Sequence, residues 1–390
     1  MRIGVYSDLV YRRDGDLLST NRAFIRFVTS LPPLVDEVVL FGRLDPEPGR
    51  NPYELPRDRM SLVPLPFYPR VTSIARVVHA ARRSCQIFAA ELEQLDAVWI
   101  FGPHPLAVVF AAIARRRGVP LFLGVRQDYP QYIAGRLPGR GWKWAVPAAH
   151  LLDRAFRRLA RRAPTVALGA ELARHYDRGA PVLTTGFSLV RTAELRPLED
   201  AFATSWDGPL RLLSVGRLDP EKNPLLMADV IAALRRRDAR WRLVVAGDGP
   251  LRTAFEERLA ELGLVDAVEL HGEVANGPEL WELYWSCHAF LHVSLTEGLP
   301  QVLLEAFAAG VPVVATAVGG VVEAAGDAAL LVPPDDADAA AAALSRLTED
   351  EALRRRLIEA GAVSARRHTL EIESRRLADF LADPRGTRVG

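Results

Sequence analysis

The segment that decides the fold runs from Ser214 to Pro224 and reads SVGRLDPEKNP. An apolar, strand-like run ends just before Gly216, where the missing Cβ lets the backbone turn sharply. Two cations follow, Arg217 and Lys222, and Pro224 then suits the first turn of a helix. This strand–turn–helix order is typical of a Rossmann-like unit, in which ligands bind beyond the carboxyl ends of the strands.

Two interpretations of these cations stay open. At the carboxyl edge of a sheet they can neutralise a diphosphate; alternatively, they are surface charges on a solvated turn. The chain has only two lysines, Lys143 and Lys222, because nearly all of its basic residues are arginine. A surface cation would therefore be arginine here, which favours a specific task for Lys222.

A second segment, Ser294 to Thr316, reads SLTEGLPQVLLEAFAAGVPVVAT. Glu297 is expected in a loop after a strand, and Gly298 permits a close backbone approach. Pro300 marks the first turn of a helix whose free N–H groups can bind phosphate. Glu305 stands among apolar neighbours, where an idle charge would be costly, so it is expected to accept hydrogen bonds from hydroxyl groups of a ligand.

Short β-branched runs alternate with helical patterns along the whole chain, which predicts an α/β protein with parallel sheets and crossover helices. The strands expected in the first half are 2–7, 37–42, 97–101, 121–125 and 165–168. The strands expected in the second half are 211–215, 242–246, 267–271, 289–293, 313–316 and 329–332. A polar stretch from Thr192 to Pro209 separates the two series, so we expect two facing Rossmann-like domains, at 1–200 and 208–368. Residues 369–390 are expected to form a helix that returns to the first domain.

The composition is that of a globular protein with 390 residues, 49% of them hydrophobic and 25% charged, and a net charge of +1. A nucleic-acid binder would show a strong basic excess. The two cysteines, Cys85 and Cys287, form no disulfide framework or metal-binding pattern. The first residues lack the long apolar stretch of a signal peptide, and no apolar run is long enough to span a membrane. We therefore expect a cytoplasmic protein.

Four ordered motifs in the second half resemble those of family 4 of the retaining glycosyltransferases, whose fold is called GT-B. They are VGRLDPEKN, VVAGDGPLR (Val244 to Arg252), HGEV (His271 to Val274) and the glutamate pair Glu297 and Glu305. The resemblance implies transfer of a sugar from a nucleoside diphosphate sugar to a hydroxyl acceptor, with retention of anomeric configuration. The first domain would bind the acceptor and the second the donor.

The resemblance also implies a role for each matched residue. Arg217 and Lys222 would bind the donor diphosphate, Glu297 would contact sugar hydroxyls, and Glu305 would hold the ribose. The remaining donor contacts would come from backbone groups at Gly216, Val274, Gly298, Leu299, Pro300 and Gln301. No cofactor beyond the nucleotide sugar is implied, and no metal site is expected.

The first half departs from the family pattern at two places. The first loop, Asp8 to Asn21, offers only Gly15 where the family has a glycine pair near the donor. Arg126 or Gln127 stands where the family has a histidine. We expect Arg126 to act directly on a substrate, either on the sugar or on an acidic group; pairing with Asp128 is the alternative.

The acceptor is expected to be a glycan or a lipid-linked sugar, and no nucleic-acid partner is expected. Trp142, Trp144 and the run LLDRAFRRLARRAP (151–164) resemble an interfacial helix, which would bring the chain to the inner membrane face. An ordinary helix with an arginine-covered outer face is the favoured alternative. Two other functions stay open: a nucleotide-sugar epimerase of GT-B fold, and a nucleotide-sugar-binding subunit without turnover.

Overall fold

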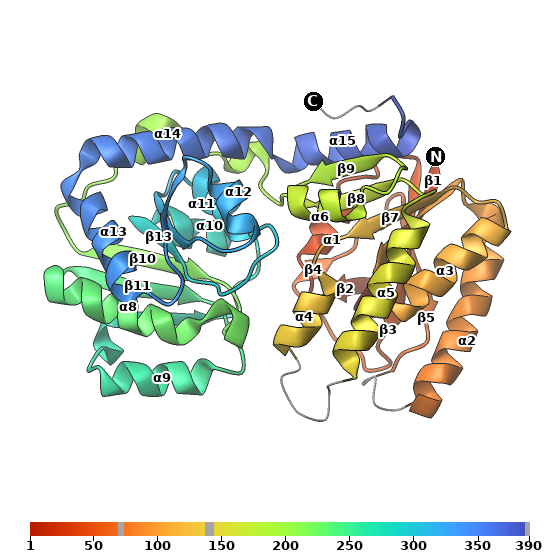
Figure 1. The fold of residues 1–390 in the computed structure, drawn as a ribbon, viewed down its shortest axis with the longest axis horizontal. Helices are drawn as coiled ribbons and strands as arrows, with labels where there is room; N and C mark the ends of the chain where they lie inside the picture. Colours follow the sequence, from red (N-terminus) through yellow and green to blue (C-terminus); the bar gives the residue numbers. More distant parts are fainter. Residues whose placement is uncertain (69–73, 137–143, 387–390) are drawn as a thin grey trace. The chain divides into compact units, whose positions relative to one another are not determined.

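The computed structural model describes residues 1–68, 74–136 and 144–386. The chain forms two compact units (Figure 1): unit 1 comprises Met1–Phe187 and Glu371–Gly390, and unit 2 comprises Ser188–Leu370. The boundary lies earlier than expected, because residues 188–200 belong to unit 2. Arg196 N donates to Ala308 O at 2.8 Å, which fastens this polar stretch to unit 2.

Unit 2 is built on a six-stranded sheet with the order β12-β11-β10-β13-β14-β15, in which all neighbours are parallel. The strands are β10 (Leu210–Val215), β11 (Trp241–Ala246), β12 (Val268–Gly272), β13 (Ala289–His292), β14 (Val313–Thr316) and β15 (Ala329–Val332). Each lies within one residue of its predicted bounds. The prediction succeeded for β13 and β14 because every residue in them is buried, so that they read as continuous apolar runs; β10 and β11 are buried at most positions.

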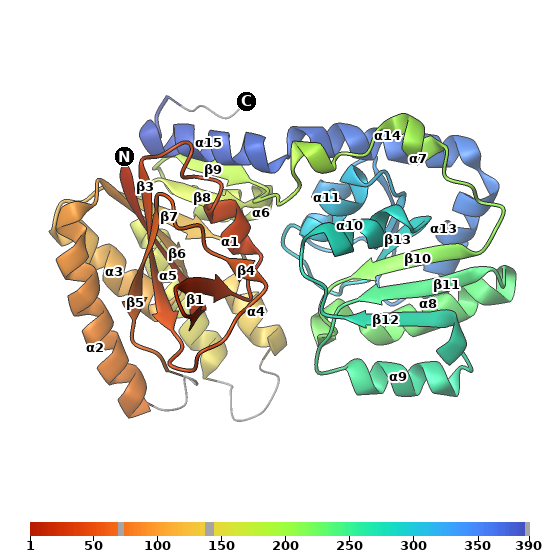
Figure 2. The ribbon, with the colours of Figure 1, turned by 180° about the vertical axis from the view of Figure 1, so that it is seen from behind.

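Helices cover both faces of this sheet (Figure 2). They are α7 (Leu198–Phe202), α8 (Pro224–Arg237), α9 (Arg252–Glu261), α10 (Pro278–Trp285), α11 (Gln301–Ala308), α12 (Gly320–Ala325), α13 (Ala337–Glu349) and α14 (Glu351–Arg367). Alternate strand residues serve two cores: Leu212 and Leu243 pack with α8, α9 and α13, whereas Leu213 and Val244 pack with α10 and α11.

Unit 1 has a nine-stranded sheet, whose parallel part runs β5-β3-β1-β6-β7-β8-β9. Its strands are β1 (Arg2–Asp14), β2 (Leu17–Thr20), β3 (Glu37–Leu44), β4 (Tyr53–Glu54), β5 (Met60–Leu65), β6 (Ala97–Gly102), β7 (Leu121–Val125), β8 (Thr165–Leu168) and β9 (Val182–Thr185). Its helices are α1 (Phe24–Val28), α2 (Ile74–Glu91), α3 (Pro105–Arg116), α4 (Tyr129–Arg136), α5 (Ala145–Leu159), α6 (Gly169–Tyr176) and α15 (Leu370–Ala382). The sequence did not predict β2, β4, β5 and β9, which are short or lie near the ends of the sheet.

The expected first loop is partly wrong, because β1 continues through it. The register of β1 against β3 shifts between Tyr6 and Val10, and residues 12–14 then pair antiparallel with β2. Gly15 has φ +57° in the turn of this hairpin, a conformation that glycine adopts without strain. An Asp-Gly-Asp turn is a usual hairpin connection, so the signal was present in the sequence.

The C-terminal segment from Glu371 onward, which includes most of α15, belongs to unit 1. The buried carboxylate of Glu373 accepts hydrogen bonds from Thr185 Oγ1 at 2.6 Å and from Gly186 N at 3.2 Å. The Phe380 ring lies 6.2 Å from that of Phe122. These contacts fix the last helix against the end of β9 and the face of β7.

Candidate functional site

The strand order of unit 2 places its candidate site at β10 and β13. The chain leaves β10 toward β11 on one side and later returns to β13 on the other, so the connections diverge between these two strands. Ligands of open α/β sheets bind at such a point, beyond the carboxyl ends. The loops after β10 and β13 meet there, since Leu295 N donates to Glu221 O at 2.9 Å.

Lys222 and Glu297, predicted from separate segments, form an ion pair between Nζ and Oε2. Their side chains are 25% and 16% exposed, so a ligand can still reach them. Ser294 Oγ donates to the same carboxylate at 3.3 Å, and His292 Nε2 lies 3.7 Å from it. Burial lowers the pKa of His292 to about 4, an effect that Glu297 opposes and Lys222 adds to. His292 is therefore neutral at pH 7.

Arg217 also has carboxylate partners. It forms an ion pair with Asp219 and a second with Glu221 at 3.2 Å, and its side chain is 46% exposed. Both predicted cations are thus paired with carboxylates: Arg217 with two of its own loop, and Lys222 with one of the loop after β13.

Glu305 lies on α11 and is 4% exposed. Its Oε1 accepts from Asn276 Nδ2 at 2.7 Å, and its Oε2 accepts from Tyr284 Oη at 2.9 Å. Burial and the Glu305 charge raise the pKa of Tyr284 well above its usual value, so Tyr284 stays a donor. Val274 is half-buried two residues before Asn276, beyond the end of β12. The sequence analysis found Glu305 and Val274 but missed Asn276 and Tyr284, which carry no motif.

Glycines let the loops of the site pack backbone to backbone. A Cβ at Gly320 would lie 1.6 Å from Gly298 O, and one at Gly319 would lie 2.3 Å from Glu297 O. Gly320 N also donates to Glu297 O at 3.1 Å. The pair Gly319-Gly320 therefore supports the loop that carries Glu297. The sequence analysis missed it, although two adjacent glycines after a strand were a usable signal.

The loop after β10 rests on the segment 247–249. A Cβ at Gly247 would lie 1.8 Å from Gly216 O, and Leu218 N donates to Asp248 O at 2.9 Å. The other predicted backbone contacts continue from Gly298 into the start of α11. They are Leu299, Pro300, whose φ of −76° and ψ of 110° are extended, and Gln301, the first residue of the helix.

Two predicted site residues, Gly15 and Arg126, belong to unit 1, whereas the residues described so far belong to unit 2. Gly15 is exposed at the hairpin turn, with nothing within 4 Å of a Cβ built on it. Arg126 directly follows β7, and its Nη2 donates to Ser7 Oγ at 3.2 Å. It forms no ion pair with Asp128, whose Oδ1 accepts from Gln131 N at 2.9 Å instead.

A second polar network of unit 1 surrounds Asp8. Arg43 Nη2 donates to Asp8 Oδ2 at 3.1 Å, and Arg43 Nε lies 3.1 Å from Oδ1. His104 lies with Nε2 3.7 Å from Asp8 and with Nδ1 3.2 Å from the hydroxyl of Tyr6. Burial lowers the pKa of His104 and Asp8 opposes this. Tyr6 and Asp8, which His104 contacts, both belong to unit 1.

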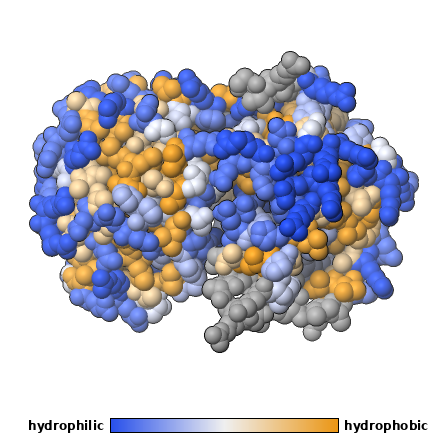
Figure 3. Space-filling view, in the orientation of Figure 1, coloured by the Kyte–Doolittle hydropathy of each residue, from blue (hydrophilic) through white to orange (hydrophobic). Residues whose placement is uncertain are grey.

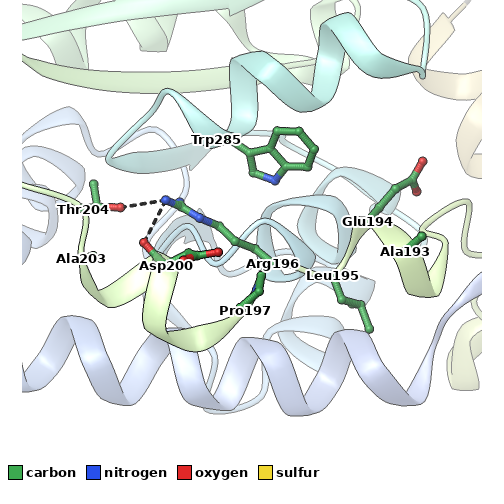
Figure 4. A pocket seen from close by; sticks show the side chains of 9 residues that line it. All are labelled: Ala193, Glu194, Leu195, Arg196, Pro197, Asp200, Ala203, Thr204 and Trp285. Carbon is green, nitrogen blue, oxygen red and sulfur yellow. Dashed lines mark hydrogen bonds between the residues drawn. The ribbon is translucent and has the colours of Figure 1, made fainter.

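A separate hollow of about 600 Å³ lies in unit 2, between residues 193–204 and Trp285 (Figure 4). Arg196 Nη2 donates there to Asp200 O at 3.0 Å and to Thr204 Oγ1 at 3.2 Å. Trp285 ends α10 just before β13 begins, so the hollow lies at the amino edge of the sheet. It contains none of the predicted site residues.

Within residues 1–68, 74–136 and 144–386, no three His, Cys, Asp or Glu side chains are grouped as metal ligands. Asp336, near the end of β15, accepts from Ala339 N at 2.8 Å and so caps α13. No helix in the described part is long and apolar enough to cross a membrane. Of the segment that resembles an interfacial helix, Trp142 lies outside the described residues. Trp144 and Leu151 are exposed, and the face of unit 1 seen in Figure 3 carries hydrophilic (blue) and hydrophobic (orange) areas side by side.

Comparison with known proteins agrees with this architecture. A sucrose-phosphate synthase from Thermosynechococcus elongatus superposes with a TM-score of 0.73 over 100% of both chains, at 20% identity. The two Rossmann-like units thus have the GT-B fold of glycosyltransferases. Residues 199–363 match the family model of glycosyl transferases group 1. This segment, which spans most of unit 2, belongs to that family.

Relatives match over different lengths. A GDP-mannose-dependent alpha-mannosyltransferase of Mycobacterium tuberculosis is 29% identical over 71% of this chain and 69% of that protein. The gpi3 subunit of a phosphatidylinositol N-acetylglucosaminyltransferase of Schizosaccharomyces pombe is 35% identical, over 29% of this chain. This chain spans about a quarter of the length of several curated relatives that it matches, 25% in the case of gpi3.

Proposed function

We propose that the chain is a glycosyltransferase that moves a sugar from a nucleoside diphosphate sugar to a hydroxyl acceptor, with retention of anomeric configuration. The observation that carries the proposal is the Lys222–Glu297 pair at the β10/β13 switch point. It joins a compact cation and a carboxylate acceptor, one suited to a phosphate and the other to sugar hydroxyls. The family match of unit 2 and the named activities of the relatives support it.

Donor binding would proceed by exchange of partners. The diphosphate would take Lys222 from Glu297, and Arg217 from Asp219 and Glu221. Glu297 would then be free to accept hydrogen bonds from the sugar. As the sugar leaves, negative charge grows on the diphosphate, and cations already in place stabilise that charge more than they stabilise the bound donor.

The remaining donor contacts would follow from the same edge of the sheet. Glu305 would accept from the ribose hydroxyls by exchanging one of its present donors, Asn276 or Tyr284. The N–H groups at the start of α11 would add a positive partial charge next to the phosphates. Arg217 and Lys222 would supply the charge that a metal supplies in other enzymes, so turnover would survive EDTA.

A donor screen tests this function. The full chain is incubated with UDP-, GDP- and ADP-sugars, and unfolding is followed by thermal shift. A donor at 100 times its dissociation constant adds about 2.7 kcal/mol to the free energy of unfolding. Stabilisation by one donor, followed by transfer to an added glycan with the anomer checked by NMR, is the expected result. Isomerised nucleotide sugar without acceptor would instead identify an epimerase, and binding without turnover would identify a binding subunit.

A further inference from the structure

Arg126 stands out at the carboxyl edge of the unit 1 sheet because it is a half-buried cation between aromatic rings. Its guanidinium carbon lies 4.2 Å from the centre of the Phe24 ring and 5.2 Å from that of Phe101. Ser7 Oγ accepts one of its five N–H groups. Ring faces attract a cation, but they do not neutralise it or accept its remaining hydrogen bonds as a carboxylate would.

No carboxylate of the described residues forms an ion pair with Arg126. Asp8, next to Ser7 in the chain, is already contacted by Nη2 and Nε of Arg43. Arg22 is exposed and likewise has no ion pair in the described part. It precedes Phe24, the ring against Arg126, by two residues, and its charge acts on Arg126. Burial and the Arg22 charge lower the pKa of Arg126 to about 10, which still leaves Arg126 charged at pH 7.

Two neighbouring cations without an anion repel each other. This unfavourable arrangement of Arg22 and Arg126 has to be offset by some other interaction. A scaffold arginine would be expected to have a carboxylate partner, as Arg43 has in the same unit. An oxyanion that binds between Arg22 and Arg126 would remove the repulsion. The planar guanidinium fork matches the two oxygens of a carboxylate or phosphate.

We propose that unit 1 carries an oxyanion-binding site formed by Arg126 and Arg22 beside Ser7, and that the acceptor supplies the oxyanion as a phosphate or carboxylate group. The site itself follows from unit 1 alone. Only its assignment to the acceptor rests on the proposed function, in which unit 2 takes the donor. The first loop, with Gly15 in place of a glycine pair, and Arg126 at the family's histidine position would then both be adaptations to a negatively charged substrate.

The test separates this site from the cations of unit 2. In the full-length Arg217→Gln/Lys222→Gln chain, the unit 2 cations are gone, and inorganic phosphate and acetate are titrated by NMR at low salt. We expect one of the two anions to bind. Adding Arg126→Gln should raise its dissociation constant about tenfold or more, the size of a charge-assisted hydrogen bond. Arg22→Gln should raise it less, because Arg22 is exposed.

Arg115→Gln is the matched control, since Arg115 is an exposed arginine at the far end of α3 and should change nothing. Arg126→Lys keeps the charge and should bind the anion more tightly than Arg126→Gln. This second variant still tests the proposal if Arg126→Gln folds poorly. Tighter binding of phosphate would indicate a phosphorylated acceptor, and tighter binding of acetate an acidic one. The proposal is overturned if neither anion binds the double variant, or if Arg126→Gln and Arg126→Lys leave binding unchanged. Equal phosphate binding in the wild-type and double-variant chains would count against the unit 2 donor site, not against this one.

Discussion

Each unit ends its central strands with a cation, a carboxylate and a histidine, but the two triplets are built differently. In unit 2, Glu297 meets the single ammonium of Lys222, with His292 at 3.7 Å. In unit 1, Asp8 contacts Nε and Nη2 of the Arg43 guanidinium, whose Nη1 donates to Tyr68 O, and His104 is also at 3.7 Å. A point charge on a flexible stem can change partners, whereas a planar guanidinium held at several nitrogens fixes its carboxylate. The comparison indicates that the unit 2 triplet is exchangeable and that the unit 1 triplet is a scaffold.

The largest expected effect comes from Lys222→Ala. If the ammonium binds the diphosphate as its negative charge grows, kcat should fall by about 10² to 10³. Other enzymes lose about this much when one hydrogen-bond donor to the transition state is removed. The thermal midpoint should change little, because the pair is partly exposed. Initial rates at saturating donor and a thermal melt check both statements. A variant with near-normal kcat would end the distinction between the two triplets.

The second prediction concerns acid. The pKa of His292 lies at about 4 in the folded chain, below its ordinary value of 6.5, so the unfolded chain binds more protons between these pH values. Stability should therefore be complete above pH 6.5 and decline as the pH falls toward 4, by at most about 3 kcal/mol. His292→Asn should flatten this decline in urea titrations at pH 4 to 7. An unchanged slope would show that other groups cause it.

Arg43→Ala should act in the opposite way to Lys222→Ala. It leaves the Asp8 carboxylate without its arginine partner, and we expect a loss of about 1 to 3 kcal/mol in the free energy of unfolding. The affinity of unit 2 for its donor should not change. This affinity is measured by titration with the nucleotide identified in the donor screen. Weakened donor binding without loss of stability would mean that Asp8 is not a scaffold residue.

The smallest expected effects on stability and donor binding concern two glycines, Gly320 and Gly15. Gly320→Ala brings a Cβ to 1.6 Å of Gly298 O, so the backbone must move; overpacking of this kind costs about 1 to 3 kcal/mol and should weaken donor binding. Gly15→Ala meets no atom within 4 Å and carries only the strain of φ +57°, about 1 kcal/mol. Chemical melts and donor titrations of both variants test the contrast. Equal donor affinities would show that Gly319-Gly320 does not position Glu297.

The same contrast explains what the sequence predicts well. The predicted charged residues of the unit 2 site, Arg217, Lys222, Glu297 and Glu305, lie in two short segments that each follow a strand, so their place in the sequence puts them at one edge of the sheet. The unit 1 triplet takes Asp8, Arg43 and His104 from three distant elements, and Arg43 belongs to no motif. Its partners become visible only when β1, β3 and β6 are side by side. Asn276 and Tyr284 escaped for the same reason, since only folding brings them to Glu305.

The scarcity of lysine gives the Lys222–Glu297 pair a further use. An amine-reactive reagent can modify only Lys222, Lys143 and the N-terminal amine, so mass spectrometry needs to follow three sites. The Nζ of Lys222 is held by Glu297 and 25% exposed, which should make it slower to acylate than a free surface amine. A donor that covers it should slow the reaction further, while Lys143 provides the internal standard. Donor occupancy then becomes a labelling ratio that can be read in crude mixtures, before any acceptor has been identified.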